Sequence, residues 1–140
     1  MASEFGFSNL IELDFLVVIN KLNNGTGLFE PKVHVLIYND LQNGTDLTIH
    51  CKSKNDDLSV HLLTYRNDYE FKFRPSILLD TWFYCSMQWN RTMHWFGIYT
   101  SKRDTLMLHT CTFCLWNVRP EGTCLVEYKK VTCYSWNANA

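Results

Sequence analysis

Six cysteines constrain the fold of this chain of 140 residues more than any other feature. They are spread over separate apolar segments: Cys51, Cys85, Cys111, Cys114, Cys124 and Cys133. An even number of cysteines placed in this way predicts a framework of disulfide bonds. Disulfides persist in oxidising surroundings such as the extracellular space, so we predict that the protein is secreted.

The Cys111-x-x-Cys114 pair has two other interpretations. A zinc ribbon needs a second such pair, or two histidines, at a suitable spacing, and the sequence has neither. A thioredoxin-like redox site places the pair at the start of a helix, whereas residues 115–118 here favour a strand. We therefore expect disulfides, with no metal and no cofactor.

One disulfide follows from the register of a predicted hairpin. If Tyr128 and Lys129 form a two-residue turn, residues whose numbers sum to 257 lie opposite each other. Cys124 and Cys133 meet this condition, which predicts a bond between them. The same register pairs Val126 with Val131 and Glu127 with Lys130. The other four cysteines allow three pairings, which the spacing does not distinguish. We favour the two pairings in which Cys51 and Cys85 each bond to one member of the Cys111-x-x-Cys114 pair.

From residue 33 onward, apolar residues alternate with polar ones, as in strands that are buried on one face. The clearest runs are Val33 to Tyr38, Leu47 to Cys51, Tyr69 to Phe73 and Phe83 to Trp89. Turn residues separate about eight or nine such runs, each roughly ten residues from the next. The pattern predicts an all-β fold, a disulfide-linked antiparallel β-sandwich over residues 31–138.

Residues 1–30 lack the alternation, and we expect them to form a leader or a flexible N-terminal arm. A signal peptide needs a basic start and an unbroken apolar stretch, but Glu12 and Asp14 interrupt the apolar residues here. The segment is therefore not a convincing signal. Either the natural start is missing or replaced, or this copy no longer enters the secretory route. Because the cysteines indicate secretion, we favour the first.

The charge balance excludes some classes of function. Thirteen Lys and Arg face 14 Asp and Glu, a formal charge of −1. Binding to a nucleic acid duplex requires a basic surface, so we expect no nucleic acid partner. The longest apolar run, Phe15 to Ile19, is far shorter than the roughly 20 residues of a membrane-spanning helix. We expect no membrane insertion.

Three Asn-x-Thr sequons, at Asn24, Asn43 and Asn90, are candidate glycosylation sites in a secreted glycoprotein. The five histidines have no neighbouring nucleophile motif, and the sequence has no GxSxG, HExxH or Gly-rich phosphate loop. We therefore predict that the protein is not an enzyme and has no catalytic residues.

An ordered set of motifs over residues 32–137 resembles the plant self-incompatibility S-protein family. The first are Val33-His34-Val35-Leu36-Ile37-Tyr38-Asn39-Asp40-Leu41 and Leu47-Thr48-Ile49-His50-Cys51, followed by an acidic loop that ends at Leu58. Later ones are Tyr69-Glu70-Phe71-Lys72-Phe73, Thr81-Trp82-Phe83-Tyr84-Cys85, Cys114-Leu115-Trp116, Gly122-Thr123-Cys124 and Cys133-Tyr134-Ser135-Trp136-Asn137. Ser59 stands where the family usually has glycine, which suggests a turn that needs positive φ.

The resemblance implies a small secreted plant signalling ligand. Founding members act in the pistil and trigger rejection of self pollen through a cell-surface receptor protein. We expect a monomer that meets its receptor through exposed connections, chiefly residues 100–108 with Lys102, Arg103 and Asp104. Charge reversal at Lys102 and Arg103 is expected to weaken receptor binding without changing thermal stability. Residues 40–46, 66–68 and 90–93 are further candidates.

The five tryptophans offer an alternative function. Most are expected in the core, but aromatic rings on the surface can also stack on sugars. The alternative is a secreted lectin-like or defence-related module that binds cell-wall carbohydrate. An outward-facing Trp82 or Trp95 would favour it.

Overall fold

The structure, a computed structural model, describes residues 32–75, 80–104 and 111–136. The predicted arm at residues 1–30 and the sequon at Asn24 lie outside these ranges. The elements are β1 (Val33–Asn39), β2 (Leu47–Lys52), β3 (Asp57–Leu63), β4 (Asp68–Phe73), β5 (Trp82–Trp89), β6 (Thr92–Thr100), the helical turn α2 (Ser101–Asp104), β7 (Phe113–Arg119), β8 (Gly122–Glu127) and β9 (Lys130–Ser135). None of the described helices is long and apolar enough to span a membrane.

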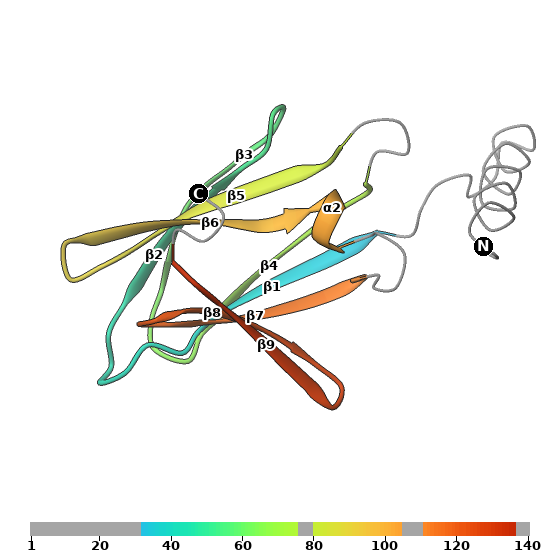
Figure 1. Cartoon of the computed structure of the whole chain (residues 1–140). Helices are drawn as coiled ribbons and strands as arrows, with labels where there is room; N and C mark the ends of the chain where they lie inside the picture. The colour runs from blue at the N-terminus through green and yellow to red at the C-terminus, as the bar shows by residue number, and fades with distance from the viewer. Residues whose placement is uncertain (1–31, 76–79, 105–110, 137–140) are drawn as a thin grey trace, which may run out of the picture. The chain divides into compact units, whose positions relative to one another are not determined.

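The strands form two sheets, which confirms the predicted all-β sandwich (Figure 1). One sheet has the order β4-β1-β7-β8-β9, and the other has the order β3-β2-β5-β6. Neighbouring strands run antiparallel, except for β1 and β7, which run parallel. A parallel pair needs a long crossover connection, and here the chain passes through the whole second sheet between β1 and β7.

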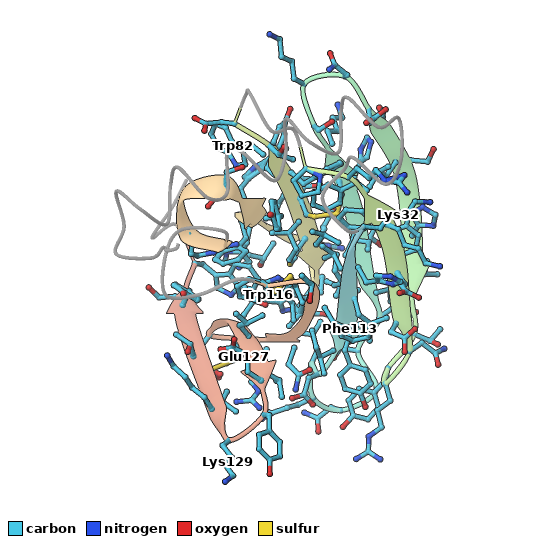
Figure 2. All side chains as sticks on the ribbon, turned by 90° about the vertical axis from the view of Figure 1, so that its right-hand side faces the viewer. Lys32, Trp82, Phe113, Trp116, Glu127 and Lys129 are labelled. Carbon is cyan, nitrogen blue, oxygen red and sulfur yellow. A yellow bond between two sulfur atoms is a disulfide. The ribbon has the colours of Figure 1, made fainter. Side chains whose placement is uncertain are left out.

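The core lies between the sheets and contains the apolar residues that alternate along each strand. Val33, Val35 and Ile37 of β1 are buried, as the period of two predicted. Aromatic rings join the two layers: the ring centroids of Phe71 on β4 and Phe83 on β5 are 5.0 Å apart. Trp116 on β7 is fully buried and lies 5.1 Å from Phe96 on β6 (Figure 2).

The last two strands form the hairpin that the sequence predicted. Cys124 lies opposite Cys133 in the β8–β9 register, beside the pairs Val126–Val131 and Glu127–Lys130. The two sulfurs are bonded, and the Cα atoms are 3.9 Å apart. The prediction of this disulfide from turn length alone is confirmed.

The favoured pairings of the other four cysteines were wrong. Cys51 bonds to Cys85, and Cys111 bonds to Cys114. The first bond forms because β2 and β5 are neighbours in one sheet and place Cys51 directly opposite Cys85. All four side chains are buried.

The Asn39 side chain stabilises the turn that follows β1. Asn39 is buried at the end of β1, where its side-chain Nδ2 donates to the carbonyls of Thr45 and Leu63 and its Oδ1 accepts from the N–H of Leu41. These bonds hold the turn that carries the Asn43 sequon. Asn43 is exposed, and so is Asn90 in the β5–β6 hairpin. Glycosylation at both positions stays a prediction.

Candidate functional site: an exposed aromatic face

The outward face of the β3-β2-β5-β6 sheet is the strongest candidate for a functional site. Five of the eight large hydrophobic side chains that are exposed among the described residues lie on it: Val60, Leu62, Trp82, Met93 and Trp95. Together with Tyr84 they form what we call the aromatic face. Larger exposed apolar patches are rare on soluble monomers and mark binding surfaces.

The strand registers place these residues on one side of the sheet. His50 on β2 lies opposite Val60 on β3 and Ser86 on β5, and Ser86 lies opposite Trp95 on β6. The next row in the same registers joins Leu62, Thr48, Gln88 and Met93. Residues that lie opposite each other in neighbouring strands share a face, so the patch is set by backbone pairing rather than by flexible loops.

Three aromatic rings form a row at one end of this face. The ring centroids of Trp82 and Tyr84 are 6.1 Å apart, and those of Tyr84 and Trp95 are 6.2 Å apart. Trp82 is 56% exposed and Trp95 is 46% exposed (Figure 2 labels Trp82). The lack of a side chain at Gly97 leaves room for the Trp82 indole, because a Cβ added at Gly97 would lie 3.2 Å from the indole Nε1.

His50, in the row that crosses this face, contacts Asp57. The His50 Nε2 lies 2.7 Å from Oδ1 of Asp57, which also accepts a hydrogen bond from the backbone N–H of Ser59. The His50 contact, with this backbone N–H as the second cause, holds the pKa of the Asp57 carboxyl below its ordinary value. Ser59 adopts φ of 70°, so the position where the family usually has glycine does need positive φ.

The predicted receptor loop has a different structure from the one expected. Residues 101–104 form the helical turn α2, in which Thr100 Oγ1 accepts from the N–H of Arg103. The Arg103 side chain turns toward the aromatic rings between the sheets, with its guanidinium carbon 4.8 Å from the centre of the Trp116 ring. Because of this contact, we now expect a substitution at Arg103 to change thermal stability. The Lys102 and Asp104 side chains lie outside the described part of the chain, and the receptor role of this segment stays a prediction.

Sequence reasoning identified part of the aromatic face. It named Trp82 and Trp95 as the tryptophans whose outward orientation would favour a surface site. It did not name Val60 or Leu62 as surface candidates, whereas Met93 lies within the candidate segment 90–93. The signal was present in β3, where Val60 and Leu62 alternate with His61 and Leu63. Such a strand with apolar residues on both sides does not show which side faces the core.

The fold and this face define a class of protein: a small disulfide-linked β-sandwich with exposed aromatic and aliphatic side chains on one sheet. The model of the family described as "Plant self-incompatibility protein S1" matches residues 34–136. The chain therefore belongs to this family.

Individual relatives agree with this assignment. S-protein homolog 5 of Arabidopsis thaliana is 40% identical over 115 residues, which cover 81% of this chain and 87% of the relative. S-protein homolog 3 of the same plant is 38% identical over 109 residues, 75% of this chain and 73% of the relative. A solved structure with 14% sequence identity has a TM-score of 0.52 over 75% of this chain and 96% of its own. That structure is described as one of a widespread family of small, highly stable, secreted self-incompatibility protein homologues from plants.

Proposed function

We propose that this protein is a secreted, non-enzymatic signalling ligand, and that a cell-surface receptor protein recognises it through the aromatic face. Membership of the S-protein family supports the role of ligand. The observation that carries the proposal is the clustering of exposed Val60, Leu62, Trp82, Met93 and Trp95 on one rigid face.

The composition of the face suits a protein partner. Tryptophan, tyrosine and methionine are enriched in the cores of protein interfaces, and a few buried aromatic side chains carry most of the binding energy. The aliphatic side chains of Val60 and Leu62, on the edge strand β3, widen the apolar area beyond the aromatic row. A surface of this kind favours another apolar protein surface over a charged partner.

The test is binding of labelled protein to wall-free plant cells. The variant Val60→Ser/Trp95→Ser removes two exposed side chains from the aromatic face. The matched control, Phe113→Ser/Val131→Ser, removes two side chains of similar exposure from the other sheet. We expect saturable binding that cell-surface proteolysis abolishes, that the first variant loses and that the control keeps. Because all four side chains are exposed, thermal stability should change little in either variant.

Equal loss of binding in the two variants would assign the receptor contact elsewhere. Binding that survives proteolysis of the cell surface would contradict a protein receptor.

A specific observation keeps carbohydrate binding as a second candidate. The row Trp82, Tyr84 and Trp95 presents aromatic rings beside the polar side chains of Ser86 and Gln88. Sugars stack on such rings while neighbouring polar groups accept and donate hydrogen bonds.

The two candidates depend on different residues. On an array of plant wall glycans, a carbohydrate binder should lose its signal in Trp82→Ala and keep it in Val60→Ser/Leu62→Ser. A protein receptor contact that covers the whole face should weaken in both variants, with no signal on the array.

A further inference from the structure

The three disulfides differ in their access to solvent. Cys51, Cys85, Cys111, Cys114 and Cys124 are all buried, whereas Cys133 is exposed. Cys133 lies on β9, which is the last strand in the described order of the five-stranded sheet. Cys133 is thus accessible at the edge strand, while Cys124 is buried on β8, which has β7 and β9 as neighbours on its two sides.

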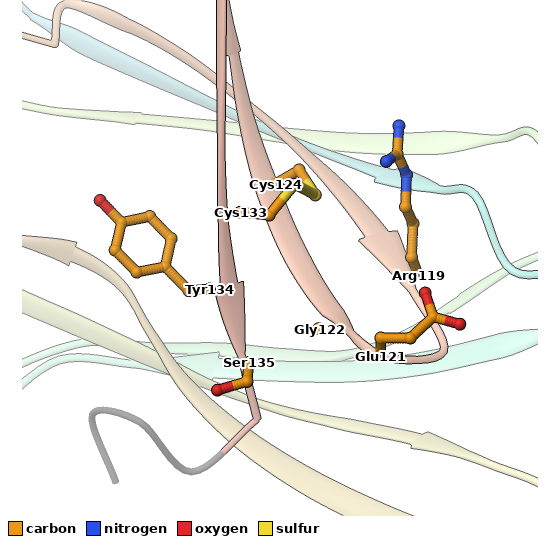
Figure 3. Close-up of a pocket in the computed structure, with 7 residues that line it drawn as sticks. All are labelled: Arg119, Glu121, Gly122, Cys124, Cys133, Tyr134 and Ser135. Atoms are coloured by element: carbon orange, nitrogen blue, oxygen red, sulfur yellow. A yellow bond between two sulfur atoms is a disulfide. The ribbon is translucent and has the colours of Figure 1, made fainter.

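A pocket lies beside this bond. It has a volume of about 270 Å³ and is lined by Arg119, Glu121, Gly122, Cys124, Cys133, Tyr134 and Ser135. Figure 3 shows the disulfide between β8 and β9, with the Arg119 side chain on the same side of the strands and the Tyr134 ring pointing the other way. The pocket is open to solvent, which lets an external group approach the bond.

We propose that Cys133 is a thiol–disulfide exchange site, independent of the proposed receptor contact. The reaction partner is an external thiol, either a small thiol peptide or a cysteine of a dithiol protein. Its thiolate attacks Sγ of Cys133, the bond to Cys124 breaks, and the electron pair leaves on the Cys124 thiolate, which takes up a proton from solvent. A second thiol then attacks the mixed disulfide, releases the Cys133 thiolate and is itself oxidised to a disulfide with the first.

Exposure makes this disulfide easier for an external thiol to attack than the other two. Exchange requires the attacking sulfur to approach in line with the S–S bond, from the far side of the sulfur that it attacks. Only Cys133, among the six cysteines, offers its sulfur on an exposed residue. Attack on Cys124, or on either buried bond, first requires part of the sandwich to open.

Reduction would loosen one defined part of the molecule. In the described sheet, β9 pairs only with β8, and the disulfide is the covalent crosslink between these strands in addition to the Tyr128–Lys129 turn. β9 carries Tyr134, whose ring lies 5.8 Å from those of Phe96 and Trp116. Exchange at Cys133 therefore gives a redox partner control over how firmly the final strand is held.

The test is timed reduction of the folded, oxidised protein at neutral pH. One arm uses glutathione and the other uses thioredoxin with its reductase and NADPH, each quenched with iodoacetamide and analysed by peptide mass spectrometry. We expect Cys124 and Cys133 to become labelled faster than the other four cysteines, by a factor on the order of ten or more. The glutathione arm should give an adduct on Cys133 and not on Cys124. If the bond reacts in just one of the two arms, that arm identifies whether the thiol comes from a small peptide or from a dithiol protein.

A fold-matched variant provides the control. In Cys124→Ala/Cys133→Ala, the two remaining disulfides should resist both reductants as they do in the wild type. Amide hydrogen exchange on the partly reduced wild type should speed up in β9 and not in β2 or β5. Labelling of Cys51, Cys85, Cys111 or Cys114 at a rate equal to that of Cys133, an adduct on Cys124, or no reaction in either arm would each overturn the proposal.

Discussion

The guanidinium carbon of Arg103 lies 4.8 Å from the centre of the Trp116 ring, and it also lies within 5.5 Å of the Phe96 and Tyr134 rings. Phe96 belongs to one sheet, whereas Trp116 and Tyr134 belong to the other. Arg103 thus contacts both layers at once. A residue that the sequence offered as a receptor contact lies against aromatic rings of both sheets.

Replacing Arg103 should therefore destabilise the protein. A cation over aromatic faces contributes roughly 0.5 to 2 kcal/mol, depending on how far it is desolvated, so we expect Arg103→Met to lower the free energy of unfolding by about 1 to 2 kcal/mol. Urea denaturation followed by tryptophan fluorescence measures this change. Arg91→Met, at an exposed arginine in the β5–β6 turn, is the control and should change stability little. Equal stability of the two variants would show that the aromatic contacts of Arg103 contribute nothing.

Ser59 offers a stabilising substitution. Its φ of 70° lies in the left-handed region, which costs a residue with a side chain roughly 1 to 2 kcal/mol and costs glycine little. Glycine loses some of this advantage through the entropy of the unfolded chain. We expect Ser59→Gly to raise the free energy of unfolding by about 0.5 to 1 kcal/mol. Ser59→Ala keeps the unfavourable φ and should not raise the free energy of unfolding. Urea denaturation compares the two variants.

The sequence predicted local features of the fold better than distant ones. Alternation located the inward residues of β1, and the two-residue turn gave the Cys124–Cys133 bond. Both depend on neighbours in the chain. The Cys51–Cys85 bond depends on the pairing of β2 with β5, which are separated by two other strands in the sequence. No local pattern specifies that choice.

The same limit applies to the candidate site. Alternation along β5 puts Trp82 and Phe83 on opposite faces, and Phe83 is buried whereas Trp82 is exposed. The outward direction of Val60 depends on how β3 pairs with β2, and the inward direction of Arg103 depends on aromatic rings from three strands. Tertiary contacts decide both, because each residue type is common inside proteins and on their surfaces alike.

The disulfides should contribute unequally to stability. A crosslink restricts the unfolded chain more when it closes a longer loop, and the bonds span 34, 9 and 3 residues for Cys51–Cys85, Cys124–Cys133 and Cys111–Cys114. Paired alanine replacements should cost about 4, about 3 and about 2 kcal/mol in that order. Urea denaturation of the three double variants measures the ranking. A variant of Cys111–Cys114 that is less stable than one of Cys51–Cys85 would contradict the chain-entropy explanation.

The His50–Asp57 pair should make stability depend on pH in the acid range. Because the folded protein lowers the pKa of Asp57, the folded state binds this proton less readily than the unfolded state. The resulting stability is fully present above the ordinary pKa of 3.8 and is lost as the pH falls through the lower folded value. Asp57→Asn should therefore lose less stability than the wild type between about pH 4 and pH 2.

Thermal unfolding across this pH range tests the expectation, with Asp56→Asn as a control that removes the adjacent carboxyl. NMR titration of the wild type should place the Asp57 midpoint below 3.8. A midpoint at or above that value would show that His50 and the Ser59 N–H do not favour the charged form.

Gly97 and Trp82 should be energetically coupled. A Cβ at Gly97 would lie 3.2 Å from the indole Nε1 of Trp82 and 3.2 Å from Cγ2 of Thr100, closer than relaxed packing allows. The exposed indole is the group that is free to move, so Gly97→Ala should shift the Trp82 indole N–H resonance and weaken any binding that needs its present position. In a Trp82→Ser background, the indole no longer crowds the added methyl group. Gly97→Ala should then lower the free energy of unfolding by less than it does in the wild type. The coupling energy from the four proteins should be about 0.5 to 1 kcal/mol, and a value near zero would mean that the backbone, rather than the indole, yields to the added methyl group.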